Sequence, residues 1–248
     1  MPMDSHTMTV DHMQEAGHPA LKPYFDDLAQ QRDASTFGMW VFLLTEIMFF
    51  GGMFCAYLIF RNLYHDAFVA ASNTLDVVLG TINTAVLICS SLTMAMAVWS
   101  AHMGRRLMIV VFLIATVLLG LVFLSIKGVE YKEKWDSHHV PGLNFSTDAF
   151  THPEKSQGEG ELGHPALPSD VAQHTVIYFG LYFCLTGMHA LHMIIGIGIL
   201  CFLIRFAWDG HYTADHYTMI ENFGLYWHFV DIIWIFLFPL LYLISRHR

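Results

Sequence analysis

The sequence predicts an all-α membrane protein, a five-transmembrane-helix bundle with one long extramembrane loop between the third and fourth helices. Two observations predict this class. The 248 residues are 55% hydrophobic and only 13% charged, with a mean hydropathy of +0.47, which is too apolar for an ordinary soluble domain. Five segments are also apolar over at least about 20 residues, the length needed to cross a hydrocarbon core of about 30 Å.

The predicted spans lie at residues 37–60, 77–99, 107–126, 176–204 and 223–245. The first contains a single charged residue, Glu46, and the second and third contain none. The short link 101–106 predicts that the second and third helices form an antiparallel hairpin. The fourth and fifth contain no Lys or Arg, and histidines and one aspartate are their main ionisable residues.

Two segments outside the spans complete the organisation. Residues 1–35 form a polar tail before a five-span domain at 36–248, and they lack the apolar core of a signal peptide. Residues 127–175 are rich in Pro, Gly, His, Asp and Glu and are expected to form the loop. Lys and Arg are nearly balanced between the two sides of the membrane, so charge does not fix the orientation. The net charge of −9 argues against a nucleic-acid partner.

Glu46 lies near the middle of the first span, among aromatic and aliphatic side chains. An ionisable group at this depth costs several kcal/mol unless it is paired or faces a protein interior. A hydrogen bond to His189 or His192 of the fourth span would satisfy both groups. Such a residue can serve in proton exchange, act as a polar anchor for lipid or a neighbouring helix, or be a neutral carboxyl that is hydrogen-bonded inside the bundle.

His189 and His192 are three residues apart and therefore share one helix face. This spacing also occurs in di-iron bundles, but those sites need several carboxylates, and the spans supply only Glu46 and Asp231. A haem would require histidines that face each other across a cavity. Small residues such as Gly187 and Gly196 favour close helix packing instead. Metal and haem sites remain alternatives to that packing.

The last span carries His228 and Asp231 within the segment Tyr226–Asp231. Their spacing of three residues places both on one face of the helix. Two ionisable groups on one buried face are costly unless they are paired or face a protein interior. We therefore expect another helix or a partner protein to contact this face.

The motifs around these polar residues resemble subunit III of cytochrome c oxidase, in chain order and from about residue 36 to 245. Phe42–Phe50, FLLTEIMFF, resembles the segment around the family's intramembrane glutamate. Thr186–Gly196, TGMHALHMIIG, is similar to the family's TGxHGxHVIIG segment. Gly128–Tyr131 agrees more weakly.

The C-terminal motif extends this resemblance. His216 and Glu221 match the family's HxxxxE pair, and Tyr226–Leu237 is similar to its YWHFVDxxWxFL ending. Two departures stand out: Ala190 replaces the usual Gly, and the mitochondrial form has seven spans. The chain resembles the five-span bacterial forms.

The resemblance implies a non-catalytic subunit with no haem or copper of its own. Haem and copper would be held by partner subunits, and the complex would reduce O2 to water while it pumps protons. Subunit I is the expected main contact, beside a proton-uptake entrance, with subunit II and a small subunit IV as further candidates. Bound phospholipid, sustained turnover and a place in a respiratory supercomplex are also implied. Family topology predicts a bacterial inner membrane location with a cytoplasmic N-terminus, a periplasmic C-terminus and a periplasmic 127–175 loop.

The resemblance also implies roles for individual residues, none of them catalytic or metal-binding. Arg205 is expected near a lipid headgroup. His228 and Asp231 are expected to act as polar clamps at a helix interface. The residues expected to have proton- or lipid-associated roles are Glu46, His189, His192, His216, Glu221, His228 and Asp231.

Other functions remain open at this stage. The subunit III of a quinol oxidase and the related accessory protein of nitric oxide reductase share the five-span form. A stand-alone proton channel or transporter could use Glu46, His189 and Asp231 as a relay. Transporters usually contain broken helices, whereas the only proline within these spans is Pro239, near the end of the last one. A haem-binding redox subunit is the remaining alternative.

Overall fold

The structure is a computed structural model that describes residues 24–142, 145–151, 168–210, 212 and 217–244. Within these residues every regular element is a helix, and five helices are long and apolar enough to cross a membrane. They are α2 (Leu28–Leu63), α4 (Val77–His102), α5 (Arg106–Asp136), α8 (Thr175–Asp209) and α9 (Thr218–Tyr242). The predicted fold class is confirmed.

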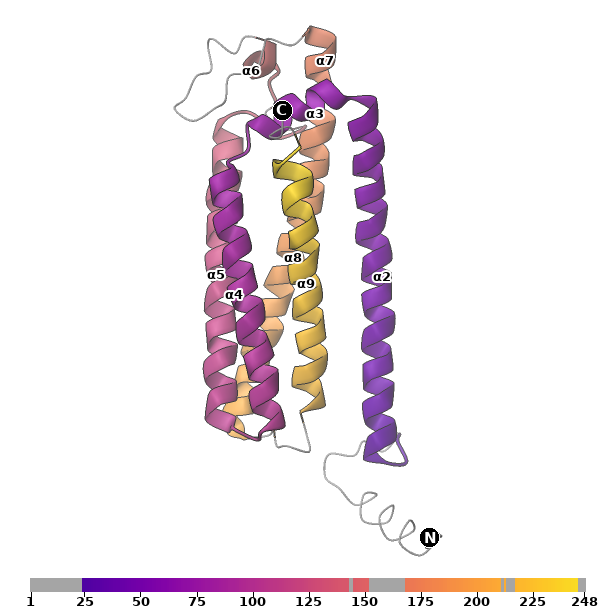
Figure 1. Cartoon of the computed structure of the whole chain (residues 1–248), viewed down its shortest axis with the longest axis vertical. Coiled ribbons are helices and arrows are strands. Elements are labelled where there is room, and N and C mark those ends of the chain that lie inside the picture. Colours follow the sequence, from indigo (N-terminus) through magenta and orange to yellow (C-terminus); the bar gives the residue numbers. More distant parts are fainter. Residues whose placement is uncertain (1–23, 143–144, 152–167, 211, 213–216, 245–248) are drawn as a thin grey trace, which may run out of the picture.

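Three short helices, α3 (His65–Asn73), α6 (Asp148–Thr151) and α7 (Ser169–Gln173), gather at one end of the bundle (Figure 1). α3 lies across this end between α2 and α4, and its residues Ala67, Phe68 and Ala71 are completely buried. Its small and aromatic side chains therefore close the end of the bundle.

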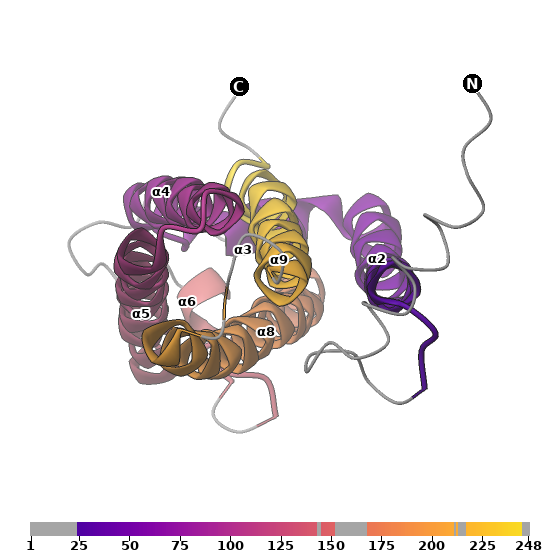
Figure 2. The same cartoon turned by 90° about the horizontal axis from the view of Figure 1, so that it is seen from below.

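Helices α4, α5, α8 and α9 form a ring when the molecule is viewed along its long axis (Figure 2). α4 and α5 run antiparallel and are joined by a turn at Gly104, whose φ of +64° suits a residue without a Cβ. The predicted hairpin is thus confirmed. The ring also buries Trp227 and Trp234 of α9, so α9 is the helix with the largest buried side chains.

Helix α2 stands outside this ring, beside α8 and α9 (Figure 2). Its buried residues are Leu43, Phe50 and Tyr57, which recur at intervals of seven, or about two helical turns. A seam this narrow leaves most of the α2 surface exposed in the isolated chain. Each contact that joins α2 to the ring is therefore important for holding α2 in place.

Two tyrosines close the C-terminal end of α9. The last carbonyl groups of a helix have no intrahelical partner and cannot be left bare in a membrane. The Tyr57 hydroxyl donates to the Leu240 carbonyl at 2.7 Å, and the Tyr178 hydroxyl donates to the Leu241 carbonyl at 2.8 Å. Tyrosine hydroxyls from α2 and α8 thus satisfy two of the last carbonyl groups of α9.

Several helices extend beyond their predicted spans. The third span was expected to end at residue 126, and the 127–175 loop to follow, but α5 continues to Asp136. Lys127, Glu130 and Lys134 recur on one inward face of this extension and are buried, so the extension belongs to the bundle. The physical reason is that their charges are satisfied by partners inside the protein, which hydropathy alone does not reveal.

The polar tail at 1–35 is also corrected at its end, because α2 already begins at Leu28. The side chain of Asp27 caps this helix by accepting a hydrogen bond from the Gln30 backbone N–H at 2.6 Å. α8 continues to Asp209 and ends at Gly210, whose φ is +81°. α9 begins at Thr218, before the predicted start at 223.

Candidate functional site

Glu46 and His192 form a polar contact between α2 and α8. Glu46 Oε2 lies 3.2 Å from His192 Nε2, and the two side chains are 19% and 13% exposed. From α9, the Tyr226 hydroxyl donates to the His192 carbonyl oxygen at 2.9 Å. The Phe50 ring packs 5.4 Å from the imidazole. The hydrogen bond expected for Glu46 is therefore present, and its partner is His192.

His189 lies elsewhere, inside the helix ring. It is 1% exposed, and its imidazole packs 5.4 Å from the Phe123 ring and 5.2 Å from the Trp234 ring. Among the described residues, neither of its ring nitrogens has a hydrogen-bond partner. Although one helical turn separates His189 from His192, the two histidines thus have different surroundings.

The α4–α9 interface is joined by polar contacts. His228 Nδ1 lies 2.7 Å from the Ser91 hydroxyl, and the Trp227 indole donates to the Ser90 hydroxyl at 3.0 Å. Asp231 is buried, but its carboxylate oxygens have no hydrogen-bond partner within the described part of the chain. His228 therefore makes a contact of the kind expected of an interhelical clamp, and the buried Asp231 lies at the same interface, near Ser91.

Two other predicted site residues, Glu221 and Arg205, lie near the opposite end of the bundle from α3. Glu221 is in the first turn of α9, where its Oε1 is 4.0 Å from Nε2 of His102, and both side chains are exposed. Arg205 pairs with Asp209 on its own helix at 2.7 Å. His216 lies outside the described residues. Glu221 and Arg205 are thus separate from the Glu46–His192 contact.

A buried cluster around Lys127 and Glu130 was not among the predicted sites. Lys127 Nζ donates to Glu130 Oε2 at 2.8 Å and to the Tyr242 hydroxyl at 2.9 Å. The Tyr182 hydroxyl donates to Glu130 Oε1 at 2.6 Å, and Tyr242 also donates to this oxygen. The ammonium group lies 5.0 Å from the centre of the Trp234 ring. The cluster links α5, α8 and α9.

Two further contacts continue this cluster along α5. The Tyr131 hydroxyl is 2.6 Å from the Thr186 hydroxyl on α8, and Lys134 donates to the Thr74 carbonyl next to α3. The signal in the sequence was the inward spacing of Lys127, Glu130 and Lys134 directly after an apolar span. An ionisable face that continues a membrane helix indicates burial against partners.

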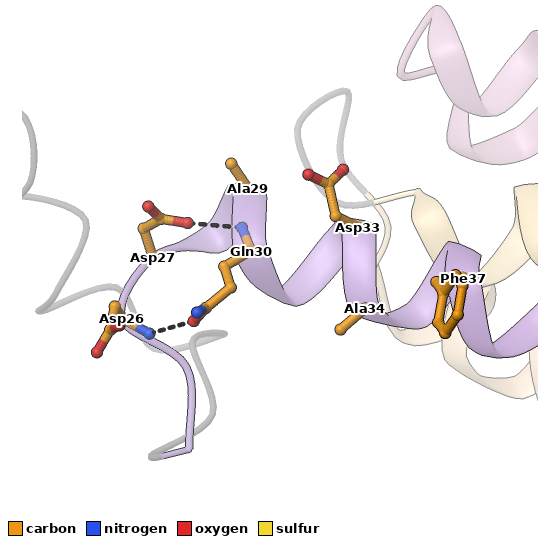
Figure 3. A pocket seen from close by; sticks show the side chains of 7 residues that line it. All are labelled: Asp26, Asp27, Ala29, Gln30, Asp33, Ala34 and Phe37. Carbon is orange, nitrogen blue, oxygen red and sulfur yellow. Dashed lines mark hydrogen bonds between the residues drawn. The ribbon is translucent and has the colours of Figure 1, made fainter.

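A hollow at the start of α2 is the surface feature drawn in Figure 3. It is lined by Asp26, Asp27, Ala29, Gln30, Asp33, Ala34 and Phe37. The Asp27 carboxylate and the Gln30 side chain each take part in a capping hydrogen bond there. These polar groups therefore cap the start of α2. The hollow that they line is about five helical turns from Glu46.

The intramembrane contacts differ in what they can do chemically. Within the described residues, no three His, Cys, Asp or Glu side chains are grouped so that they could hold a metal ion. The Lys127–Glu130 cluster is almost fully buried and hydrogen-bonded on several sides. The Glu46–His192 contact joins a carboxyl group and an imidazole, both of which can carry a proton, and it is partly accessible from outside the chain. It is the candidate functional site.

Comparisons with known proteins agree with the resemblance. A family profile described as cytochrome c oxidase subunit III matches residues 169–246. The cytochrome c oxidase subunit 3 of Danio rerio is 30% identical over 218 residues, which cover 83% of this chain and 68% of the relative. The chain belongs to the subunit III family of haem–copper oxidases.

Other members of this family are similar over most of their length. The cytochrome c oxidase subunit 3 of Thermostichus vulcanus is 28% identical over 89% of this chain and 92% of the relative. The cytochrome bo(3) ubiquinol oxidase subunit 3 of Pseudomonas aeruginosa is 27% identical over 85% of each. As a subunit III, the chain is a multi-pass membrane component of an oxidase and associates with other oxidase subunits.

Proposed function

We propose that this subunit III is the non-catalytic subunit of a proton-pumping aerobic oxidase of the cytochrome c type. It packs on subunit I, contacts subunit II and a small subunit IV, and supports proton uptake and sustained turnover. The Glu46–His192 contact carries this proposal, because it places two proton-exchanging groups at mid-span with partial access from outside the chain. Haem and copper belong to the partner subunits.

The proposal includes a membrane location and a lipid. The chain spans the bacterial inner membrane, with the start of α2 on the cytoplasmic side and the end of α9 on the periplasmic side. This agrees with an odd number of spans and with the opposite positions of these ends in Figure 1. Phospholipid binds along the exposed apolar surface, and Arg205, which is 69% exposed, is available to a headgroup.

A quinol oxidase is the second candidate. The probable quinol oxidase subunit 3 of Staphylococcus saprophyticus is 27% identical over 89% of this chain, close to the 28% of the Thermostichus vulcanus cytochrome c oxidase subunit 3. The purified complex should oxidise reduced cytochrome c and consume O2 in step. Oxidation of a quinol with no oxidation of cytochrome c would replace the first candidate by the second.

The role of Glu46 is tested with Glu46→Gln in the purified complex. We expect normal assembly, with slower proton uptake or a faster loss of activity during turnover. Glu133→Gln is the matched control, because Glu133 is an exposed carboxyl on α5 that has no contact with His192. If Glu46→Gln left turnover, proton pumping and the inactivation rate unchanged, Glu46 would be a structural residue only.

A further inference from the structure

Two polar side chains inside the helix ring have no hydrogen-bond partner among the described residues. They are Asn83 on α4, which is 0% exposed, and His189 on α8, which is 1% exposed. Both polar atoms of each side chain are affected: the amide nitrogen and oxygen of Asn83, and the two ring nitrogens of His189. The large majority of buried polar groups in proteins are hydrogen-bonded, either to protein or to ordered water. A bilayer supplies no bulk water at this depth, so the partners of these groups must lie inside the ring.

Asn83 belongs to the face of α4 that points into the ring. The buried residues along this face include Gly80, Asn83, Leu87 and Ser90. The Ser90 hydroxyl accepts a hydrogen bond from the Trp227 indole of α9. A Cβ on Gly80 would meet the rings of Phe238 and Tyr242, also on α9. Because residues on both sides of Asn83 contact α9, the amide between them is directed at the ring and not at lipid.

Trp234 of α9 connects the depth of Asn83 with that of His189. Its indole N–H donates at 3.1 Å to Thr84, the residue that follows Asn83. Its ring lies 5.2 Å from the imidazole of His189 and 4.8 Å from the ring of Phe123 on α5. Each of the four ring helices thus contributes one side chain at this depth. We call these four residues, Asn83, Phe123, His189 and Trp234, the Trp234 layer.

The polar side chains next to the Trp234 layer already use their own hydrogen-bonding capacity. The Lys127 ammonium group lies 5.0 Å from the centre of the Trp234 ring. Its three N–H groups donate to Glu130 at 2.8 Å, to Tyr242 at 2.9 Å and to Tyr182 at 3.3 Å. An ammonium group has no further donor. The Lys127–Glu130 cluster therefore borders the layer without supplying a partner for Asn83 or His189.

Water has the hydrogen-bonding chemistry that both groups require. An amide offers two N–H donors and an acceptor oxygen, and a neutral imidazole offers one donor and one acceptor. A buried water makes about three hydrogen bonds and can donate or accept in each, so it fits either tautomer of His189. A metal ion would need more ligands, and in the described part of the chain no three His, Cys, Asp or Glu side chains are grouped to hold one.

We propose that the Trp234 layer is a bound-water site, in which ordered water is hydrogen-bonded to both Asn83 and His189. Since α4 and α8 lie on opposite sides of the ring, this water joins them across its centre (Figure 2). The site is separate from the Glu46–His192 contact and requires nothing of the function proposed above. Its test therefore needs no measurement of oxidase activity.

Two tryptophans of α9 provide a matched pair of probes. A brief X-ray pulse converts water to hydroxyl radicals, which oxidise the side chains beside their source, and mass spectrometry then locates the oxidised residues. Trp234 and Trp227 are both 0% exposed, and each indole donates to a hydroxyl group of α4. Trp227, however, packs against Gly120 and Gly196, away from the Trp234 layer. A bound water in the layer should therefore cause oxidation of Trp234 and not of Trp227.

The experiment uses the intact complex and compares the natural chain with Asn83→Leu and His189→Phe. Each variant removes one of the two groups that hold the water, so each should lose the oxidation of Trp234. Leu87→Ile is the control, because it keeps the volume of an apolar side chain one turn further along the same face of α4. The control should leave the oxidation of Trp234 unchanged.

Unfolding temperatures give a second test with an opposite sign for a dry layer. If water joins the two groups, each single variant deprives the other group of its partner and lowers the unfolding temperature, and the double variant recovers part of the loss. If both groups are dry, each single variant removes an unpaired buried group and raises that temperature.

Three results would overturn the proposal: equal oxidation of Trp234 and Trp227 in the natural chain, no oxidation of either, or oxidation of Trp234 that persists in Asn83→Leu or His189→Phe. The comparison of the two tryptophans needs no substitution. It therefore decides the proposal even if a variant fails to assemble.

Discussion

Lys127 Nζ lies 2.8 Å from Glu130 Oε2, one turn along α5, and the two side chains are only 4% and 2% exposed. An ion pair buried this deeply is stable only when its remaining hydrogen-bonding capacity is satisfied. Tyr182 and Tyr242 provide that satisfaction from α8 and α9. The pair therefore fixes how three helices meet.

Removing either member alone should destabilise the protein strongly. Lys127→Met or Glu130→Gln leaves its partner buried without its counter-charge, which costs about 3–5 kcal/mol. The double variant should recover part of this loss, because no lone charge remains. Thermal unfolding of the purified complex would measure the difference.

The Arg205–Asp209 pair is the matched control for these variants. It has a similar distance of 2.7 Å, but the Arg205 side chain is 69% exposed. Arg205→Gln should change stability by no more than about 1 kcal/mol. Equal effects of Lys127→Met and Arg205→Gln would contradict the role given to the buried pair.

Gly196 should tolerate no side chain. A Cβ at this position would lie 2.9 Å from Cζ3 of Trp227 and 3.2 Å from Cε1 of Tyr226, both on α9. Gly196→Ala should therefore cost about 1–3 kcal/mol by forcing α8 and α9 apart. At Gly198, two residues along α8, nothing lies within 4 Å, and Gly198→Ala should be neutral or slightly stabilising. Thermal unfolding of both variants tests the packing directly.

Loss of the Tyr57 hydroxyl alone should destabilise the end of α9. Tyr57→Phe removes the donor to the Leu240 carbonyl and leaves it bare, at a cost of about 1–3 kcal/mol. Faster hydrogen exchange near the end of α9 would be the measurement. Tyr64→Phe is the control, because the Tyr64 ring stacks on His174 and its hydroxyl makes no hydrogen bond to any described residue. Identical exchange in the two variants would contradict the assignment.

His139 predicts a loss of stability in mild acid. Its ring stacks on Phe179 at 4.9 Å just beyond the end of α5, where burial, aided by the charges of Lys134 and His138, lowers its pKa from 6.5 to about 4. Between these values the unfolded state binds more protons than the folded state, so stability falls as the pH falls. The loss should reach about 2 kcal/mol at pH 5.

His139→Phe should flatten this pH dependence of the unfolding temperature, because it removes the group that takes up the proton. His65→Asn is the control, because it removes an exposed histidine of α3 that does not contribute to the pKa of His139. A wild-type slope that persisted in His139→Phe would assign the effect to another group.

The fold class could be predicted from the sequence because each span is a continuous apolar run. The partner of Glu46 could be narrowed to His189 or His192, because a buried carboxyl group needs a hydrogen-bond partner and these two histidines lie within a span. The choice of His192 could not be predicted, because it depends on how α2 is rotated against α8. The buried Lys127–Glu130 pair was missed for a related reason: charged residues end a hydropathy run, and only the tertiary structure brings Tyr182 and Tyr242 to them.

The identity of the partner chains tests the central claim, that this chain is the non-catalytic subunit of a haem–copper oxidase of the cytochrome c type. Mass spectrometry of the native complex, released intact from the membrane, is the most direct measurement. We predict one copy of this chain with a haem- and copper-bearing subunit I and a subunit II that accepts electrons from cytochrome c. Recovery as a homomer without haem-bearing partners would contradict the claim.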